Sequence, residues 1–239
     1  MNKSFFLFSF IFVVSISSAN AQLKNILDKA KESVSSLKGD NTDISKGLKE
    51  ALDKGVESAV NQLSADNGYL SSQYKILIPE DAQKVIDKVK MIPGFEDVET
   101  KLINQMNKAA EIAAKKATPI FAKAITDMSF ADAKNILTGP ENAATTYLSN
   151  SSRQALFTEF MPIIQSSLDE VNARSYWKSI TTAYNKIPFV KKMNPDLDNH
   201  VNNKALDGLF GVIAVKEKGI RTDVNQRTSD LLMKVFGNQ

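Results

Sequence analysis

Apolar residues recur at helical spacing along almost the whole chain after residue 21, and this periodicity restricts the fold more than any other feature. The clearest stripe lies within residues 43–64 and consists of Leu48, Leu52, Val56, Val60 and Leu63. Residues three or four positions apart share one face of a helix, so this stretch predicts an amphipathic helix. Only residues 74–78, just before Pro79, have a pattern typical of an extended segment. The sequence therefore predicts an all-α protein, a single irregular bundle of about eight to ten helices.

The positions of glycine and proline predict where several helices begin and end. Residues 95–128 carry a second long apolar stripe, and Thr118-Pro119 interrupts it with residues typical of an N-cap and a first helical position. Two or three helices are expected within residues 141–186, with a kink or break at Pro162. Further helices are predicted over residues 80–91, 198–220 and 228–236.

The N-terminus has the layout of a secretory signal peptide. A positive charge at Lys3 precedes an apolar run, and small residues at Ala19 and Ala21 follow it. We expect cleavage after residue 21 and export to the periplasm or the medium, without a transmembrane segment in the mature chain. No cysteine follows the cleavage point, so lipid attachment through an N-terminal cysteine is not expected. Residues 22–42 are predicted to form a leading amphipathic helix with a polar linker, and residues 43–239 a single all-helical domain.

Composition narrows the classes of partner and cofactor. The chain contains 30 basic and 27 acidic residues, which are interspersed, and nucleic-acid binding is not expected because it needs a clustered basic face. Zero cysteines exclude disulfides and thiolate metal sites, and a single histidine excludes sites with two histidines. No nucleotide-binding glycine motif is present, so we expect no cofactor, no metal and no assignable catalytic residue.

Several short segments, in order, are similar to one bacterial family. They are residues 47–52 (GLKEAL), 106–111 (MNKAAE), 128–134 (MSFADAK), 137–140 (LTGP), 204–210 (KALDGLF) and 234–237 (KVFG). Over residues 43–237 the chain resembles the family catalogued as domain of unknown function 4197. This resemblance implies an exported bacterial helical protein, and it brings no catalytic residues with it.

Residues 129–140 form the strongest local signature. Ser129 and Asp132 have the spacing of a capping box, and Gly139 is predicted to end that helix in a left-handed conformation. Lys134 has no part in these caps, and it is predicted to pair with Asp127 across the turn. We interpret this segment mainly as a structural corner and, as the alternative, as part of a binding surface.

Polar residues on apolar helical faces are the remaining candidates for ligand or partner contacts. Asp207 lies in a stretch that is otherwise apolar nearly all round, so we expect it to be buried and paired with Lys204 or Arg221. Asn107 and Glu111 lie one turn apart on an alanine-rich face. If Glu111 and Asp207 converge they could form an acid–base pair, although a structural buried network is the preferred interpretation.

The only histidine follows a segment that begins like a calcium-binding loop. Asn194, Asp196 and Asp198 occupy alternate positions, but Ala205 stands where such a loop needs a bidentate glutamate. We therefore interpret the segment as the start of a helix and His200 as an exposed residue at that start.

Three functions of different class remain open. The preferred one is a non-catalytic cell-envelope protein that binds another envelope protein or a cell-wall component. The second is a helical carrier that encloses an apolar ligand, and the third is a hydrolase built on carboxylates such as Glu111 and Asp207. A packed core favours the first function, a lined cavity the second, and a cleft with convergent carboxylates the third. The sequence predicts no oligomeric state.

Overall fold

The computed structural model describes residues 44–237 except for residues 92, 94, 171, 187, 190 and 195. The expected signal peptide and leading helix lie outside this part of the chain. The described residues form helices joined by turns, without a strand, as the all-α prediction required. In chain order the elements are a helix over residues 44–64, α2 (Glu80–Val89), α3 (Val98–Ala114), α4 (Ala117–Asp127), α5 (Phe130–Thr138), α6 (Ala143–Asp169), α7 (Ala173–Asn185), α8 (Leu197–Thr222), a short 3-10 helix (Val224–Gln226) and α9 (Asp230–Phe236).

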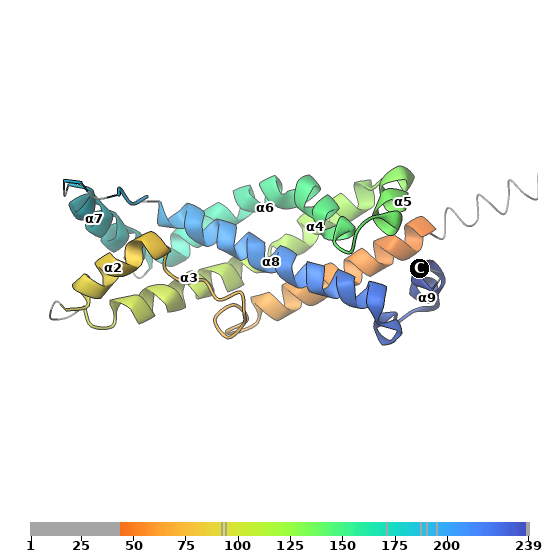
Figure 1. Cartoon of the computed structure of the whole chain (residues 1–239), viewed down its shortest axis with the longest axis horizontal. Helices are drawn as coiled ribbons and strands as arrows, with labels where there is room; N and C mark the ends of the chain where they lie inside the picture. The colour runs from red at the N-terminus through yellow and green to blue at the C-terminus, as the bar shows by residue number, and fades with distance from the viewer. Residues whose placement is uncertain are drawn as a thin grey trace, which may run out of the picture. The chain divides into compact units, whose positions relative to one another are not determined.

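Two long helices, α6 and α8, organise the bundle. They lie side by side, and α6 also packs against α3 and α4 (Figure 1). α8 buries residues on nearly every turn, including Leu206, Leu209 and Ile213, which agrees with its predicted central place. Helix 44–64 buries the predicted stripe of Leu48, Leu52, Val56, Val60 and Leu63. None of the described helices combines the length and apolarity that a membrane span requires.

Three predicted helix boundaries need correction. The interruption between α3 and α4 lies at residues 115–116, with Lys116 as N-cap, so Pro119 falls within the first turn of α4, where a missing N–H costs little. Gly139 ends α5 in an extended conformation, with φ −84° and ψ −176°, and not in a left-handed one. A Cβ there would lie 2.7 Å from the carbonyl oxygen of Asn135 and 2.9 Å from Ala143, so close approach is what requires glycine. α6 continues through Pro162 without a break.

Candidate functional site

Residue 74 lies in a turn, and residues 75–78 follow it with the alternation of buried and exposed side chains that an extended segment has, as predicted. This segment pairs with a side chain and not with a strand. The amide of Asn107 on α3 accepts a hydrogen bond from the N–H of Ile76 at 2.8 Å and donates one to its C=O at 2.9 Å. Asn107 is fully buried, and Ile76 and Ile78 point into the core while Leu77 between them is 57% exposed. The buried amide thus replaces a neighbouring strand on one edge of this segment.

Two tyrosines hold the start of this segment against α8. The Tyr69 hydroxyl donates a 2.7 Å hydrogen bond to the C=O of Ala205, and burial together with the Glu111 charge raises the pKa of that phenol. A Cβ at Gly208 would lie 2.7 Å from the Tyr69 ring, and one at Gly211 would lie 2.4 Å from the Tyr74 ring. The two glycines of α8 therefore permit the close approach of aromatic rings, where a neighbouring helix would have been the simplest expectation.

His200 joins the middle of the segment to α8. Its Nε2 lies 2.9 Å from the C=O of Leu77. Burial lowers the pKa of His200, against the opposing effect of this hydrogen bond. His200 lies in the first turn of α8, as predicted, but it is half-buried and links two elements, so the expected full exposure is wrong.

A hollow of about 710 Å³ lies between the segment and α8, and we call it the α8 groove. Residues 73–75 and 77–80 line one wall, and His200, Lys204, Asp207 and Gly208 line the other. The polar side chains of the α8 wall are spaced four and three residues apart, so they follow one another along a single helical face. The groove is therefore already shaped in the free protein, with a backbone segment on one side and polar side chains on the other.

One edge of the extended segment faces this groove, and two backbone groups on it make no hydrogen bond among the described residues. Alternate residues of an extended chain direct their N–H and C=O groups to opposite edges. The Ile76 backbone bonds to Asn107 of α3, and the Leu77 C=O bonds to His200 of α8. Lys75 and Leu77 are two residues apart, so their backbone groups lie on the same edge, which is the edge on the α8 side. Among the described residues, neither the Leu77 N–H nor the Lys75 C=O makes a hydrogen bond.

The structure corrects the prediction for Asp207. Its side chain is 52% exposed, and its carboxylate pairs with Arg153 of α6 at 2.7 Å, not with Lys204 or Arg221. Lys204 is exposed in the same groove wall. Asp207 is therefore a surface ion pair at the groove.

Glu111 is buried as part of α3 but does not meet Asp207. Its carboxylate lies 3.8 Å from Lys108, which bonds Asp66 at 2.8 Å. The two carboxylates are held by different partners on different elements, so the structure does not bring together the acid–base pair that the sequence left open.

The α5 corner is built as predicted at its start. The Ser129 hydroxyl accepts from the Asp132 N–H, and the Asp132 carboxylate accepts from the Ser129 N–H, which completes the capping box. Lys134 is exposed, and Asp127 pairs with Lys123 at 2.6 Å, so the predicted pair between Asp127 and Lys134 is wrong.

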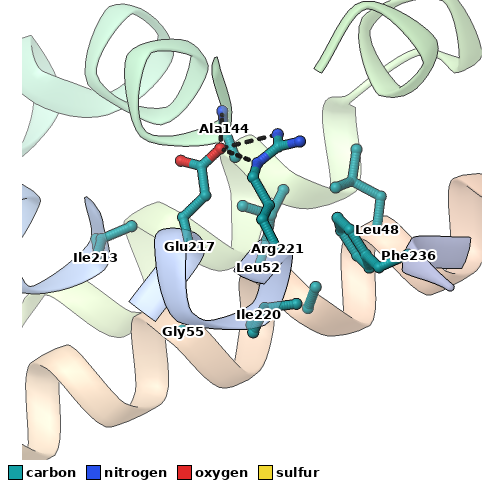
Figure 2. Close-up of a pocket in the computed structure, with 10 residues that line it drawn as sticks. Leu48, Leu52, Gly55, Ala144, Ile213, Glu217, Ile220, Arg221 and Phe236 are labelled. Carbon is teal, nitrogen blue, oxygen red and sulfur yellow. Dashed lines mark hydrogen bonds and ion pairs between the residues drawn. The ribbon is translucent and has the colours of Figure 1, made fainter. Parts of the chain in front are cut away.

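Arg221 belongs to a buried ion pair at the other end of α5 (Figure 2). Its guanidinium lies 3.0 Å from the Glu217 carboxylate and donates to the C=O of Ile136. The same carboxylate accepts from the N–H of Ala144 and from the N–H and hydroxyl of Thr145, at 2.8–2.9 Å. Glu217 therefore caps the start of α6 while Arg221 binds the end of α5, which is a structural role.

The space beside this ion pair is small. It amounts to about 20 Å³, roughly the volume that one water needs, and Leu48, Ile213 and Phe236 are among its lining residues (Figure 2). Within the described residues, no three histidine, aspartate or glutamate side chains are grouped so that they could hold a metal ion. Asp196 caps α8, and Asp198 accepts from Arg174 at 3.0 Å, so both serve local structure at the loop that resembles a calcium site.

Sequence reasoning missed Glu217 and Arg153, and it gave Arg221 the wrong partner. Glu217 and Arg221 are spaced four residues apart, which is the one local signal for their pair. Arg153 gave no signal, because its partner lies 54 residues away. Gly208 and Gly211 in α8 are a signal for large side chains that approach this helix closely, and Tyr69 and Tyr74 are those side chains.

The comparisons with known proteins identify a family and no function. A family model described as "Protein of unknown function (DUF4197)" matches residues 38–237, so the chain belongs to this family. No curated protein and no solved structure matches the chain.

Proposed function

We propose that this DUF4197 protein is an exported, non-catalytic binding protein of the cell envelope, which holds an extended segment of a partner protein in the α8 groove. One observation carries the proposal: the Lys75 C=O and the Leu77 N–H, which make no hydrogen bond among the described residues, lie on the edge that faces a preformed groove. Addition of an extended peptide to such an edge is a common mode of protein recognition, in which main-chain hydrogen bonds supply affinity.

The free groups fit a parallel pair of strands. In a parallel pair of strands, each bonded residue of one strand lies opposite a residue of the other strand. It donates to the C=O of the residue before that opposite residue, and it accepts from the N–H of the residue after it. The Lys75 C=O and the Leu77 N–H flank Ile76 in this way. When a partner segment runs parallel to residues 75–78, one of its residues satisfies both groups. The side chains of that partner segment then meet Lys204 and Asp207 on the opposite wall.

The two other functions receive less support. A carrier of an apolar ligand needs an enclosed volume of hundreds of cubic ångströms, whereas the space beside the Glu217 pair holds about 20 Å³. A carboxylate hydrolase needs two carboxyl side chains that face the same substrate. Glu111 is buried beside Lys108, whereas Asp207 pairs with Arg153.

The location of the protein is part of the proposal. The charged start, apolar run and small residues within residues 1–21 support export through a cleaved signal peptide. N-terminal sequencing of the protein recovered from the periplasm or medium should begin at Gln22. An intact Met1 form held in the inner membrane would contradict this proposal.

Site-specific photo-cross-linking tests the binding surface. A photoreactive amino acid replaces exposed Gln73 in the groove wall or, as the matched control, exposed Val224 outside it. We expect the Gln73 position to capture one protein in the native envelope through a mapped peptide that Val224 does not capture. Equal capture at both positions, or none at Gln73, would contradict the assignment of the groove.

A further inference from the structure

The region from α7 to the start of α8 is unusually basic for this protein. Residues 171–194 contain five basic residues and no acidic residue, although the whole chain has nearly equal numbers of both. Arg174 is held by Asp169 and Asp198. The other basic residues are Lys178, Lys186, Lys191 and Lys192, all of them exposed. This concentration of positive charge is local and does not follow from the net charge.

An apolar side chain stands in the middle of this basic region. Phe189 lies between α7 and α8 with a relative exposure of 108%, next to exposed Pro188. Its φ of 63° is in the left-handed region, which a bulky aromatic residue rarely adopts. Both features are unfavourable for an isolated soluble protein, and no contact among the described residues compensates for the exposed ring.

A second apolar group lies at the same end of the helices. Met91, just after α2, is 83% exposed, and Tyr176 on α7 is 45% exposed. The rings of Phe95 and Tyr176 meet edge to face at 5.9 Å, which fixes the turn after α2 against α7. Two turns therefore present apolar side chains at the end of the bundle that also carries the lysines.

We propose that this end of the protein docks on a bilayer of anionic phospholipid, with Phe189 inserted at the interface and Lys186 and Lys192 bound to headgroup phosphates. Charge complementarity favours this partner. An anionic bilayer offers an apolar interior for the exposed Phe189 ring and a negative surface for the lysines, which lie in a stretch without acidic residues. An inserted apolar side chain with basic residues beside it provides the two contributions on which binding to a bilayer surface depends, burial of apolar area and attraction to anionic lipids. The proposed contact shares no residue with the α8 groove, whose α8 wall consists of His200, Lys204, Asp207 and Gly208.

A local probe tests the contact directly. The chain has no cysteine, so Pro188→Cys places a single environment-sensitive fluorophore next to an intact Phe189, and Val224→Cys places the same probe on a remote exposed site. With phosphatidylglycerol-containing vesicles, we expect a blue shift at position 188 and none at position 224. An unshifted probe at 188, or an equal shift with pure phosphatidylcholine vesicles, would overturn the proposal.

Charge variants measure the electrostatic part. Each lysine at an anionic surface contributes roughly fivefold in affinity, so the double variant Lys186→Gln/Lys192→Gln should bind these vesicles roughly 25-fold more weakly. The control Lys115→Gln/Lys116→Gln removes the same charge from exposed positions between α3 and α4 and should bind like the parent. Phe189→Ser should also weaken binding without changing the urea midpoint. Equal effects of the two double variants, or full binding by Phe189→Ser, would show that another surface is responsible.

Discussion

Replacement of Asn107 by alanine should destabilise the protein strongly, because this buried amide holds the wall of the groove. The variant removes both partners of Ile76 and leaves its N–H and C=O unsatisfied in a buried place. Each unsatisfied buried backbone group costs about 1–3 kcal/mol, so we expect a loss of about 2–4 kcal/mol once partial hydration of the segment is allowed for.

Equilibrium unfolding in urea measures this loss. With a slope of about 2–3 kcal/mol per molar urea for a domain of this size, the midpoint should fall by about 1 M. Asn104→Ala is the matched control, since Asn104 is exposed on the same helix. Hydrogen exchange should also accelerate at Ile76 in the Asn107 variant. A variant as stable as the parent would refute the view that this amide fixes the extended segment.

Three further predictions follow from the same structure. Glu217→Ala strands a buried arginine and should cost about 3–5 kcal/mol in thermal unfolding, whereas Asp207→Ala should cost about 0–1 kcal/mol because that pair is exposed; equal losses would contradict this assignment. Gly211→Ala should destabilise the protein by about 1–3 kcal/mol through the clash with Tyr74, while Gly55→Ala, whose Cβ would meet only Lys216 at 3.9 Å, should stabilise it by about 0.5–1 kcal/mol. Because burial lowers the folded-state pKa of His200, the unfolded chain binds the proton first as the pH falls; the contribution of His200 to stability is present above its unfolded pKa of about 6.5 and is lost below it. Between about pH 7.5 and about pH 5, the parent should therefore lose more stability in urea titrations than His200→Gln, and equal losses would contradict this.

Local features could be predicted from the sequence because their causes are local. Ser129 and Asp132 form the capping box at the predicted spacing, and the stripe of helix 44–64 is buried as expected. Each depends on residues within one or two helical turns. The same reasoning detected the extended segment before Pro79, although it could not supply the Asn107 amide that pairs with Ile76.

The candidate site could be predicted only in part, because its contacts join distant segments. Apolar neighbours on all sides of Asp207 suggested burial, yet Arg153 of α6 reaches that face of α8 and keeps the carboxylate at the surface. Lys204 and Asp207 were among the candidates from the sequence and both line the groove, but its other wall is a segment about 130 residues earlier in the chain. The sequence carries no local signal for a contact between two segments so far apart in the chain.

Deletion of a single N–H at the groove edge tests the central claim most directly. Leu77→Pro removes the N–H that makes no hydrogen bond in the free protein, and Leu77→Ala removes the same exposed side chain while it keeps the N–H. Once urea unfolding shows that both variants are folded, their photo-cross-linking yields from position 73 can be compared. The account predicts that Leu77→Ala retains the yield of the parent and that Leu77→Pro loses most of it. Equal yields from the two variants would contradict binding through the backbone edge of the α8 groove.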